Sequence, residues 1–136
     1  MATAKVQYEG ALRCKAEHLR SGQVIVTDAP TDNNGKGEAF SPTDLLATSL
    51  ATCMITIMGI RANAAGISID GTEASVLKTM GSEPRRHVAK LEVSIMVPNA
   101  DTFSEKDKKL LKQAALTCPV AESLSERIEQ EVHFNF

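Results

Sequence analysis

Apolar and polar residues alternate in several stretches of this chain, which is the pattern of half-buried β-strands. The alternation is clearest in His87–Val97 and in the closing stretch Ile128–Phe136. A turn at residues 20–22, which read Arg-Ser-Gly, separates two further β-prone stretches. The other predicted strands are Lys5–Tyr8, Ala11–Glu17, Gln23–Thr27 and Thr72–Met80.

A long helix is predicted to begin at Pro42, a residue that suits the first helical position. Ser41 precedes it as a cap, and Asp44 lies three residues after the cap, so the two form a capping box. Gly66 is the predicted stop. Because this helix is apolar or small on every face, it needs cover on all sides, from a second layer or from a partner subunit.

The second predicted helix, Ser104–Thr117, has an apolar stripe along one side and repeats the serine cap. Pro119 disfavours helical geometry at the residue before it, so this helix ends there and a short helical stretch, Val120–Ser125, follows. The polar, glycine-containing residues 31–38 are predicted to form a loop. Antiparallel strands that are segregated from two helices predict an α+β fold.

Length and composition indicate one ordinary globular domain that spans residues 1–136. A formal net charge of −2 gives no electrostatic basis for binding nucleic acid or an anionic membrane surface. The apolar run Leu45–Ile60 is shorter than the ~20 residues of a membrane-spanning helix, so no membrane partner is expected. The chain begins without an apolar leader, and three cysteines are too few for a secreted disulfide framework, so a reducing, cytoplasmic location is expected.

Two of the three cysteines are candidates for chemistry. Cys53 lies in the middle of the long helix, where apolar surroundings would keep its thiol protonated and inert unless a cation approaches. Cys118 lies at a helix end, before a proline, and is expected near the surface. The two are a candidate redox couple, which would require their Cα atoms to lie within ~7 Å of each other. Cys14, on an early strand, is expected to be structural.

The cation would have to come from elsewhere in the fold. Arg13 and Arg20 belong to an N-terminal segment that is free to fold over the long helix, although each alone is typical of a surface charge. A metal site is not expected, because the three histidines are isolated and no paired cysteine or histidine spacing occurs.

Two cysteine motifs occur together in this chain. The first reads Ser-Pro-Thr-Asp-Leu-Leu-Ala-Thr-Ser-Leu-Ala-Thr-Cys at residues 41–53, and the second reads Leu-Thr-Cys-Pro-Val-Ala-Glu-Ser-Leu at residues 116–124. This pair resembles the cysteine motifs of the OsmC/Ohr family of osmotically induced and organic-hydroperoxide-resistance proteins. The resemblance covers essentially the whole chain. It implies an OsmC-like α+β fold, with antiparallel sheets packed around a long central buried helix, in an intertwined homodimer with active sites at the subunit interface.

The resemblance also implies a thiol peroxidase that has no bound cofactor. Cys53 matches the family's peroxidatic cysteine, whose thiolate attacks an organic hydroperoxide, and Cys118 matches the resolving cysteine, which then forms a disulfide with it. An external dithiol of the lipoyl type would reduce that disulfide. The family's activating arginine comes from the N-terminal hairpin, where Arg13 is the preferred candidate and Arg20 the alternative.

One position departs from the family pattern. Organic-hydroperoxide-resistance members carry a glutamate ten residues before the first cysteine, where it orients the arginine, and this chain has Thr43 there. Asp44, the next residue, is a candidate substitute, but its role as a helix cap is the favoured interpretation. The departure favours, as an alternative function, a non-enzymatic dimeric stress or binding protein of the same fold. A thiol-based redox sensor is a further, weaker alternative.

Overall fold

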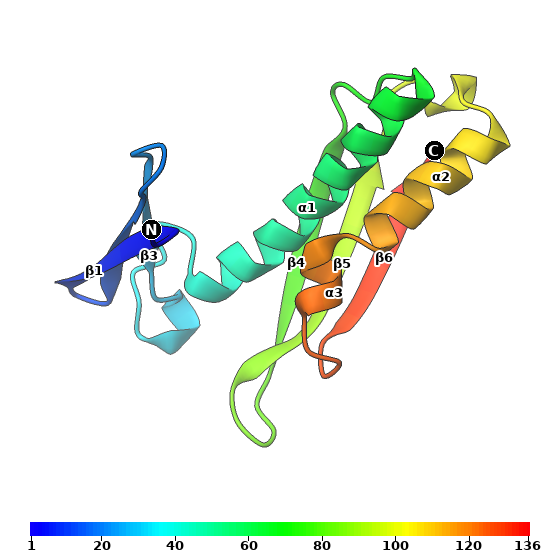
Figure 1. The fold of residues 1–136 in the computed structure, drawn as a ribbon. Coiled ribbons are helices and arrows are strands. Elements are labelled where there is room, and N and C mark those ends of the chain that lie inside the picture. Colours follow the sequence, from blue (N-terminus) through cyan, green and yellow to red (C-terminus); the bar gives the residue numbers. More distant parts are fainter. The chain divides into compact units, whose positions relative to one another are not determined.

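The computed structural model describes all 136 residues, which fall into two compact units, Met1–Leu46 and Ala47–Phe136. Each unit contains one three-stranded sheet, and the long helix α1 begins in the first unit and continues through the second (Figure 1). The strands are β1 (Ala4–Gly10), β2 (Arg13–His18), β3 (Val24–Asp28), β4 (Glu73–Gly81), β5 (His87–Met96) and β6 (Glu129–Asn135). The helices are α1 (Pro42–Ala65), α2 (Glu105–Leu116) and α3 (Pro119–Ser123), with the short 3-10 turns η1 (Thr31–Asn33) and η2 (Ala100–Thr102).

The first unit is built on an antiparallel sheet with the strand order β1-β2-β3. β2 and β3 form a hairpin across the predicted turn, where the N–H of His18 donates to the carbonyl of Gln23 (2.8 Å). Their register places Arg13, at the start of β2, opposite Asp28, at the end of β3. No apolar residue of this unit is buried. The large apolar side chains exposed on its strands are Val6, Tyr8, Val24, Ile25 and Val26.

The second unit contains a mixed sheet with the strand order β4-β5-β6. β4 and β5 form an antiparallel hairpin, but β5 and β6 are parallel. The prediction of antiparallel strands throughout is therefore wrong for β6. Parallel neighbours require a crossover connection, and α2 and α3 supply it by carrying the chain back to the end of the sheet where β5 begins.

The core of the second unit lies between its sheet and its helices. β5 buries every second residue from Leu91 through Val93 to Ile95, whereas Ser94 and Met96 are exposed, so the predicted alternation is confirmed. Figure 1 shows α1 and α2 over the same face of this sheet. The largest fully buried side chains of the unit are Leu50, Met54, Met58, Leu91, Val93, Ile95, Leu111 and Cys118.

α1 begins at the predicted residue and ends before Gly66, which has a φ of +72°. The Oγ atom of Ser41 accepts a hydrogen bond from the N–H of Asp44 (3.0 Å), and the Asp44 carboxylate accepts one from the N–H of Ser41 (2.9 Å). These reciprocal bonds confirm the predicted capping box. α2 begins after Ser104, whose Oγ atom accepts from the N–H of Asp107 (3.1 Å), as its predicted cap requires.

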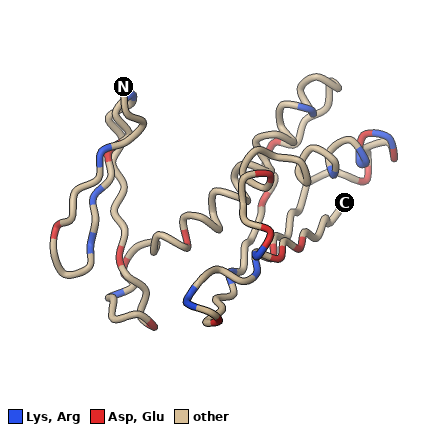
Figure 2. The backbone as a smooth tube through the Cα atoms, turned by 60° about the horizontal axis from the view of Figure 1, so that its bottom comes forward, with Lys and Arg blue, Asp and Glu red and all other residues tan.

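A single chain covers only one side of α1. Thr52, Thr56 and Ile60 are exposed, and the sequence has no charged residue between Asp44 and Arg61, so the helix is largely tan in Figure 2. The buried residues are Ala47, Leu50, Ala51, Met54, Met58 and Ala62. The predicted cover on every side is therefore not provided by one copy of the chain. By length and composition alone α1 could also cross a membrane, a criterion that core helices of soluble proteins meet as well.

Candidate functional site

Two of the three cysteines, Cys53 on α1 and Cys118 at the start of α3, meet in the second unit. Cys53 is close enough to act on the thiol of Cys118 and to raise its pKa, so the two thiols are neighbours. Neither residue is part of a disulfide. The structure thus brings together the two thiols that the sequence indicates as a candidate redox couple.

The local backbone holds Cys118 in place. Its Sγ atom accepts a hydrogen bond from the N–H of Ala121 (3.4 Å), so the sulfur caps α3, and Pro119 is the first residue of that helix. The backbone of Cys118 is extended, with φ −64° and ψ 151°, which is the conformation that a following proline favours. The whole residue is 0% exposed. The sulfur therefore has a fixed position in the core.

Burial raises the pKa of the Cys118 thiol above its ordinary value. The hydrogen bond and the charge interaction with Cys53 raise this pKa further, whereas the N–H of Ala121 lowers it. At neutral pH Cys118 is accordingly a protonated thiol, which is a poor nucleophile because the thiolate is the reactive form. Cys53 is half-buried, so it is the more accessible sulfur of the pair.

The burial of the two cysteines is the reverse of what the sequence suggests. Cys53 was expected in the interior and Cys118 near the surface, but Cys118 is the fully buried one. α1 has no polar face, so its sequence does not define which side turns inward, and Cys53 lies next to the exposed Thr52. Cys118 follows Ala114 and Ala115 of α2 closely in the sequence, and all three residues are buried in the same core.

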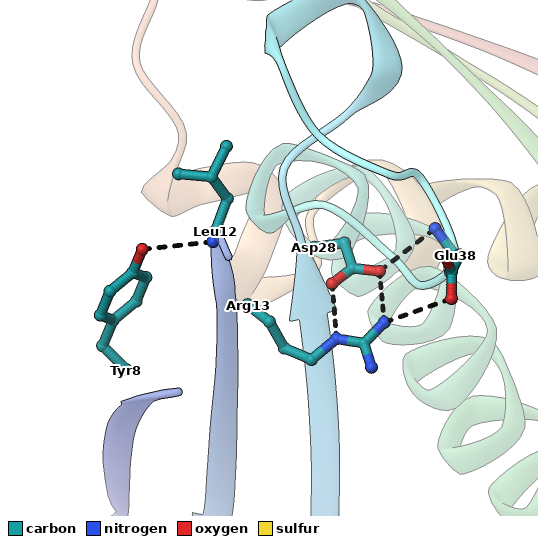
Figure 3. A network of polar contacts seen from close by, with 5 residues as sticks. All are labelled: Tyr8, Leu12, Arg13, Asp28 and Glu38. Atoms are coloured by element: carbon teal, nitrogen blue, oxygen red, sulfur yellow. Dashed lines mark hydrogen bonds and ion pairs between the residues drawn. The ribbon is translucent and has the colours of Figure 1, made fainter. Parts of the chain in front are cut away.

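The first unit contains a second polar arrangement (Figure 3). The Nε atom of Arg13 donates to Oδ1 of Asp28 (2.7 Å) and its Nη2 atom donates to Oδ2 (2.8 Å), so the ion pair is bidentate. Nη2 also lies 3.7 Å from Oε2 of Glu38. The hydrogen bond from Arg13 lowers the pKa of Asp28, and the same bond raises the pKa of Arg13. Both groups therefore stay charged over a wide range of pH.

The other candidate site residues from the sequence take no part in the Cys53–Cys118 pair or in the Arg13–Asp28 ion pair. Arg20 is exposed in the turn after β2 and makes no polar contact. Asp44 belongs to the capping box of α1, and the hydroxyl of Thr43 lies 3.3 Å from the hydroxyl of Ser41 at the same cap. Cys14 is half-buried on β2. The structure thus gives Arg13 a defined partner and gives Arg20 none.

Asp28 and Glu38 are the residues that sequence reasoning missed. A signal was present, because the turn at residues 20–22 sets the register of the β2–β3 hairpin. Counting outward from a three-residue turn pairs position 13 with position 29, but the observed loop has four residues, 19–22, and pairs position 13 with position 28. The predicted turn therefore indicated the end of β3 as the partner of Arg13, and its register was wrong by one residue.

A cluster of charged side chains lies on the neighbouring strands β5 and β6. The Nζ atom of Lys90 lies 2.8 Å from a carboxylate oxygen of Glu131 and 3.7 Å from one of Glu92. Ligand atoms of Glu92, Glu131 and His133 lie within 4.8 Å of one another, a spacing that could hold a metal ion. However, the ammonium group of Lys90 already balances these carboxylates, and its hydrogen bond lowers the pKa of Glu131. The group is therefore an ion-pair network, which arises from the parallel pairing that the sequence did not reveal.

The family model for OsmC-like proteins matches residues 35–133, which is well over half of the chain. This chain belongs to the OsmC-like protein family. The matched range contains both cysteine motifs and excludes Arg13 and Asp28. No curated protein matches the chain.

Solved structures of other OsmC-like proteins share the fold. A Psychrobacter arcticus 273-4 protein, described as an osmotic stress induced and detoxification response protein, is 50% identical, with a TM-score of 0.93 over 99% of this chain and 96% of that chain. The organic hydroperoxide resistance protein OsmC of Legionella pneumophila is 15% identical, with a TM-score of 0.76 over 100% of this chain and 98% of that chain. The organic hydroperoxide resistance protein OhrB of Bacillus subtilis is also 15% identical, with a TM-score of 0.70 over 98% of each chain. At 15% identity these two similarities establish the OsmC-like fold alone.

Proposed function

We propose that this protein is a thiol-dependent peroxidase that reduces organic hydroperoxides, with Cys53 as the peroxidatic residue and Cys118 as the resolving residue. The observation that carries the proposal is that a half-buried thiol, Cys53, and a fully buried one, Cys118, are neighbours although they come from two elements far apart in the sequence. The family gives it further support, since proteins of the same fold in Legionella pneumophila and Bacillus subtilis are organic hydroperoxide resistance proteins.

The reaction begins with Cys53 as a thiolate. Its sulfur attacks the terminal oxygen of the hydroperoxide, the O–O bond breaks, and the alkoxide takes up a proton and leaves as an alcohol. Cys53 then carries a sulfenic acid. The sulfur of Cys118 attacks the sulfur of Cys53, an S–S bond forms, and the hydroxyl group leaves as water with the proton of Cys118. A small external dithiol, of the lipoyl type, reduces the disulfide by exchange and restores both thiols.

The environment of Cys118 keeps this thiol out of the first step and leaves its proton for the second. Because burial raises its pKa, Cys118 keeps its proton while Cys53 reacts with the peroxide. That proton is then available to the hydroxyl group that leaves the sulfenic acid. The capping contact with Ala121 holds the sulfur in one position next to Cys53 throughout.

Arg13 is the cation that we assign to the Cys53 thiolate. Its guanidinium is held by two hydrogen bonds to a buried carboxylate, whereas Arg20 has no polar contact to fix it. A fixed guanidinium can offer a charge-assisted hydrogen bond to an anion without first losing side-chain freedom. Asp44 receives no chemical role in this proposal, because its carboxylate is engaged by the helix cap.

The active form in this proposal is a homodimer, in which the whole chain makes one OsmC-like domain. The first unit buries no apolar residue of its own, and Ile60 on α1 is 57% exposed. A three-stranded sheet needs a packed apolar face to be stable, and a second copy of the chain would supply the cover. Sedimentation equilibrium should therefore give a mass of twice 14.6 kDa, and a monomer at all concentrations would contradict the dimer.

Peroxide-dependent loss of thiols tests the chemistry. Reduced wild-type protein should lose two thiols rapidly on addition of one equivalent of cumene hydroperoxide. Cys53→Ser should lose none above the background, and Cys118→Ser should accumulate a sulfenic acid that a dimedone-type probe traps. Turnover with a dithiol, but not with glutathione, distinguishes an enzyme from a redox sensor.

The alternative is a non-enzymatic dimeric stress or binding protein, which the threonine at position 43 favours. Slow loss of thiols at equal rates in the wild type and in both variants would support that alternative. Cys14→Ser is the matched control, because Cys14 is a half-buried thiol in the other unit and should leave the fast phase unchanged.

A further inference from the structure

A glutamine interrupts the apolar phase of β6. Gln130 is followed in the same phase by Val132 and Phe134. The register pairs Gln130 with Leu91 of β5, which is fully buried under the helices. Side chains of paired residues on neighbouring strands point to the same face of a sheet, so Gln130 points toward the helices. A polar residue at a position whose pattern calls for an apolar one is expected where that residue has a specific task.

The side chain of Gln130 bonds to α3, the short helix that follows Cys118. Its Nε2 atom donates to the carbonyl of Ala121 (3.2 Å), nine positions earlier in the chain. Because α3 ends at Ser123, no N–H of the helix is in position to bond to this carbonyl. Gln130 therefore supplies from the sheet a hydrogen bond that a longer helix would make within itself.

α3 has little else to hold it. It has five residues, none of which is buried, whereas Cys118 at its start is 0% exposed. Isolated helices shorter than about 12 residues are marginal in water. Within α3, the hydroxyl of Ser123 donates to the carbonyl of Pro119 (2.7 Å). The bond from Gln130 is the side-chain hydrogen bond that ties α3 to the sheet.

Folded α3 is also what fixes the sulfur of Cys118. The N–H that donates to this Sγ atom belongs to Ala121, the residue whose carbonyl Gln130 holds. If α3 frays, this N–H moves away and the sulfur loses both its fixed direction and its shelter from water. The state of α3 therefore decides whether the thiol stays next to Cys53.

We propose that Gln130 is a positioning residue for Cys118, which keeps the resolving thiol buried and in place beside Cys53 by holding α3 to the sheet. The inference rests on the proposed function, because that function gives Cys118 the resolving step. All the groups involved belong to the unit Ala47–Phe136. Gln130 acts on the attack of Cys118 on the sulfenic acid, and it has no part in the reaction of Cys53 with the hydroperoxide.

The shelter of Cys118 can be measured without peroxide. Reduced protein is labelled with N-ethylmaleimide at pH 7, and mass spectrometry follows the peptides that contain Cys53 and Cys118. Since Cys118 is 0% exposed, it reacts only when its surroundings open. Gln130→Met keeps the length of the side chain but removes the donor. Labelling of Cys118 should then be about fivefold faster, as expected for the loss of one ordinary hydrogen bond, and labelling of Cys53 should keep its rate.

The fate of the sulfenic acid at Cys53 gives a second readout, which a purely structural role would not change. One equivalent of cumene hydroperoxide is added together with a dimedone-type probe, which competes with Cys118 for the sulfenic acid. Slower attack by Cys118 leaves more sulfenic acid for the probe, so Gln130→Met should give about fivefold more adduct than the wild type. The rate of peroxide consumption in the first turnover should not change, because the Gln130 side chain bonds to α3 and Cys53 lies on α1.

Two further variants separate positioning from general stability. Gln130→Lys has a similar reach and an ammonium donor, which can bond to the carbonyls at the end of a helix, so it should restore both wild-type values. Asn135→Leu removes an amide from the opposite face of the same strand, and it should change neither value. Thermal unfolding of every variant checks that it is folded at the assay temperature.

The inference is overturned if folded Gln130→Met keeps the wild-type labelling of Cys118 and the wild-type yield of adduct. It is also overturned if labelling of Cys53 and Cys118 accelerates equally, because the variant would then loosen the whole unit. A wild-type protein that is inert toward hydroperoxide would instead refute the proposed function. The labelling of Cys118 would still report whether Gln130 holds α3, so the two failures are distinguishable.

Discussion

The two units hold their candidate site residues by opposite means. In the second unit Cys118 is held by apolar packing, as a neutral thiol at 0% exposure in a core that includes Leu91 and Leu111. In the first unit Arg13 is held by charge, through a bidentate contact with Asp28, on a sheet that buries no apolar residue. The sulfur pair thus depends on a core that the chain builds for itself. The guanidinium depends on one ion pair, in a unit whose apolar surface still lacks a cover.

This difference leads to different expectations for stability. Apolar burial is worth roughly 25 cal/mol per Å² and involves no ionised carboxylate, so the core of the second unit should be less sensitive to acid than the first unit. The first unit relies on a carboxylate that must stay ionised and on exposed apolar residues that a second copy would cover. Its integrity should therefore respond to pH and to protein concentration.

The largest contrast is expected from truncating one large apolar side chain in each unit. Leu91→Ala removes a fully buried side chain, and it should lower the free energy of unfolding by about 2–5 kcal/mol in urea titrations. Ile25→Ala removes a side chain that is 47% exposed, and at low protein concentration it should cost less than about 0.5 kcal/mol.

Protein concentration sharpens this comparison. If a second copy covers the β1–β3 sheet, the loss in Ile25→Ala should grow as the concentration rises, because dimer formation adds to stability by mass action. The loss of stability in Leu91→Ala should not grow with protein concentration. Equal losses in both variants at every concentration would contradict the proposed difference between the units.

A smaller contrast is expected between the two serine caps. Ser41 is buried and exchanges two hydrogen bonds with Asp44, whereas Ser104 is exposed and accepts one from Asp107. Ser41→Ala should cost about 1–2 kcal/mol, and Ser104→Ala about 0.5–1 kcal/mol, because a buried N–H group that loses its acceptor cannot bond to water instead. Urea titrations of both variants under the same conditions check which substitution costs more stability. A larger loss of stability in Ser104→Ala would contradict this expectation.

Local signals made most of the fold predictable. Both caps involve residues three positions apart, and strand alternation has a period of two, so the helices and strands were located within a few residues of their observed ends. The parallel pairing of β6 could not be found in this way. Its sequence alternates in the same manner whichever direction its neighbour runs, and only the crossover through α2 and α3 determines the pairing.

The candidate site was predictable as a set of residues but not as a geometry. Cys53 and Cys118 were found through their motifs, yet their relative burial was reversed, because a helix without a polar face does not specify which side turns inward. Asp28 was missed for a different reason. It is fifteen positions from Arg13, and the two meet only when the register of the hairpin is fixed.

At acid pH the first unit should be the one that loses stability. The hydrogen bond from Arg13 lowers the pKa of Asp28 in the folded state, so Asp28 contributes stability above its unfolded value of about 3.9 and loses it as the pH falls through the lowered folded value. Urea titrations between pH 5 and pH 2 should show a steeper decline in the wild type than in Asp28→Asn. Parallel declines would mean that the ion pair adds nothing to stability in this range.

At alkaline pH the second unit should lose stability instead, for the opposite reason. Burial raises the pKa of Cys118 in the folded state, so the unfolded chain releases its proton first, near pH 8.5, and unfolding becomes more favourable as the pH rises toward the folded value. Under reducing conditions, urea titrations from pH 7 to pH 10 should therefore show a decline in the wild type that is smaller in Cys118→Ala. Alanine is the suitable replacement, because it removes the titrating group and leaves a small apolar residue in the core. A decline of equal size in both proteins would mean that the Cys118 thiol ionises in the folded state as readily as in water.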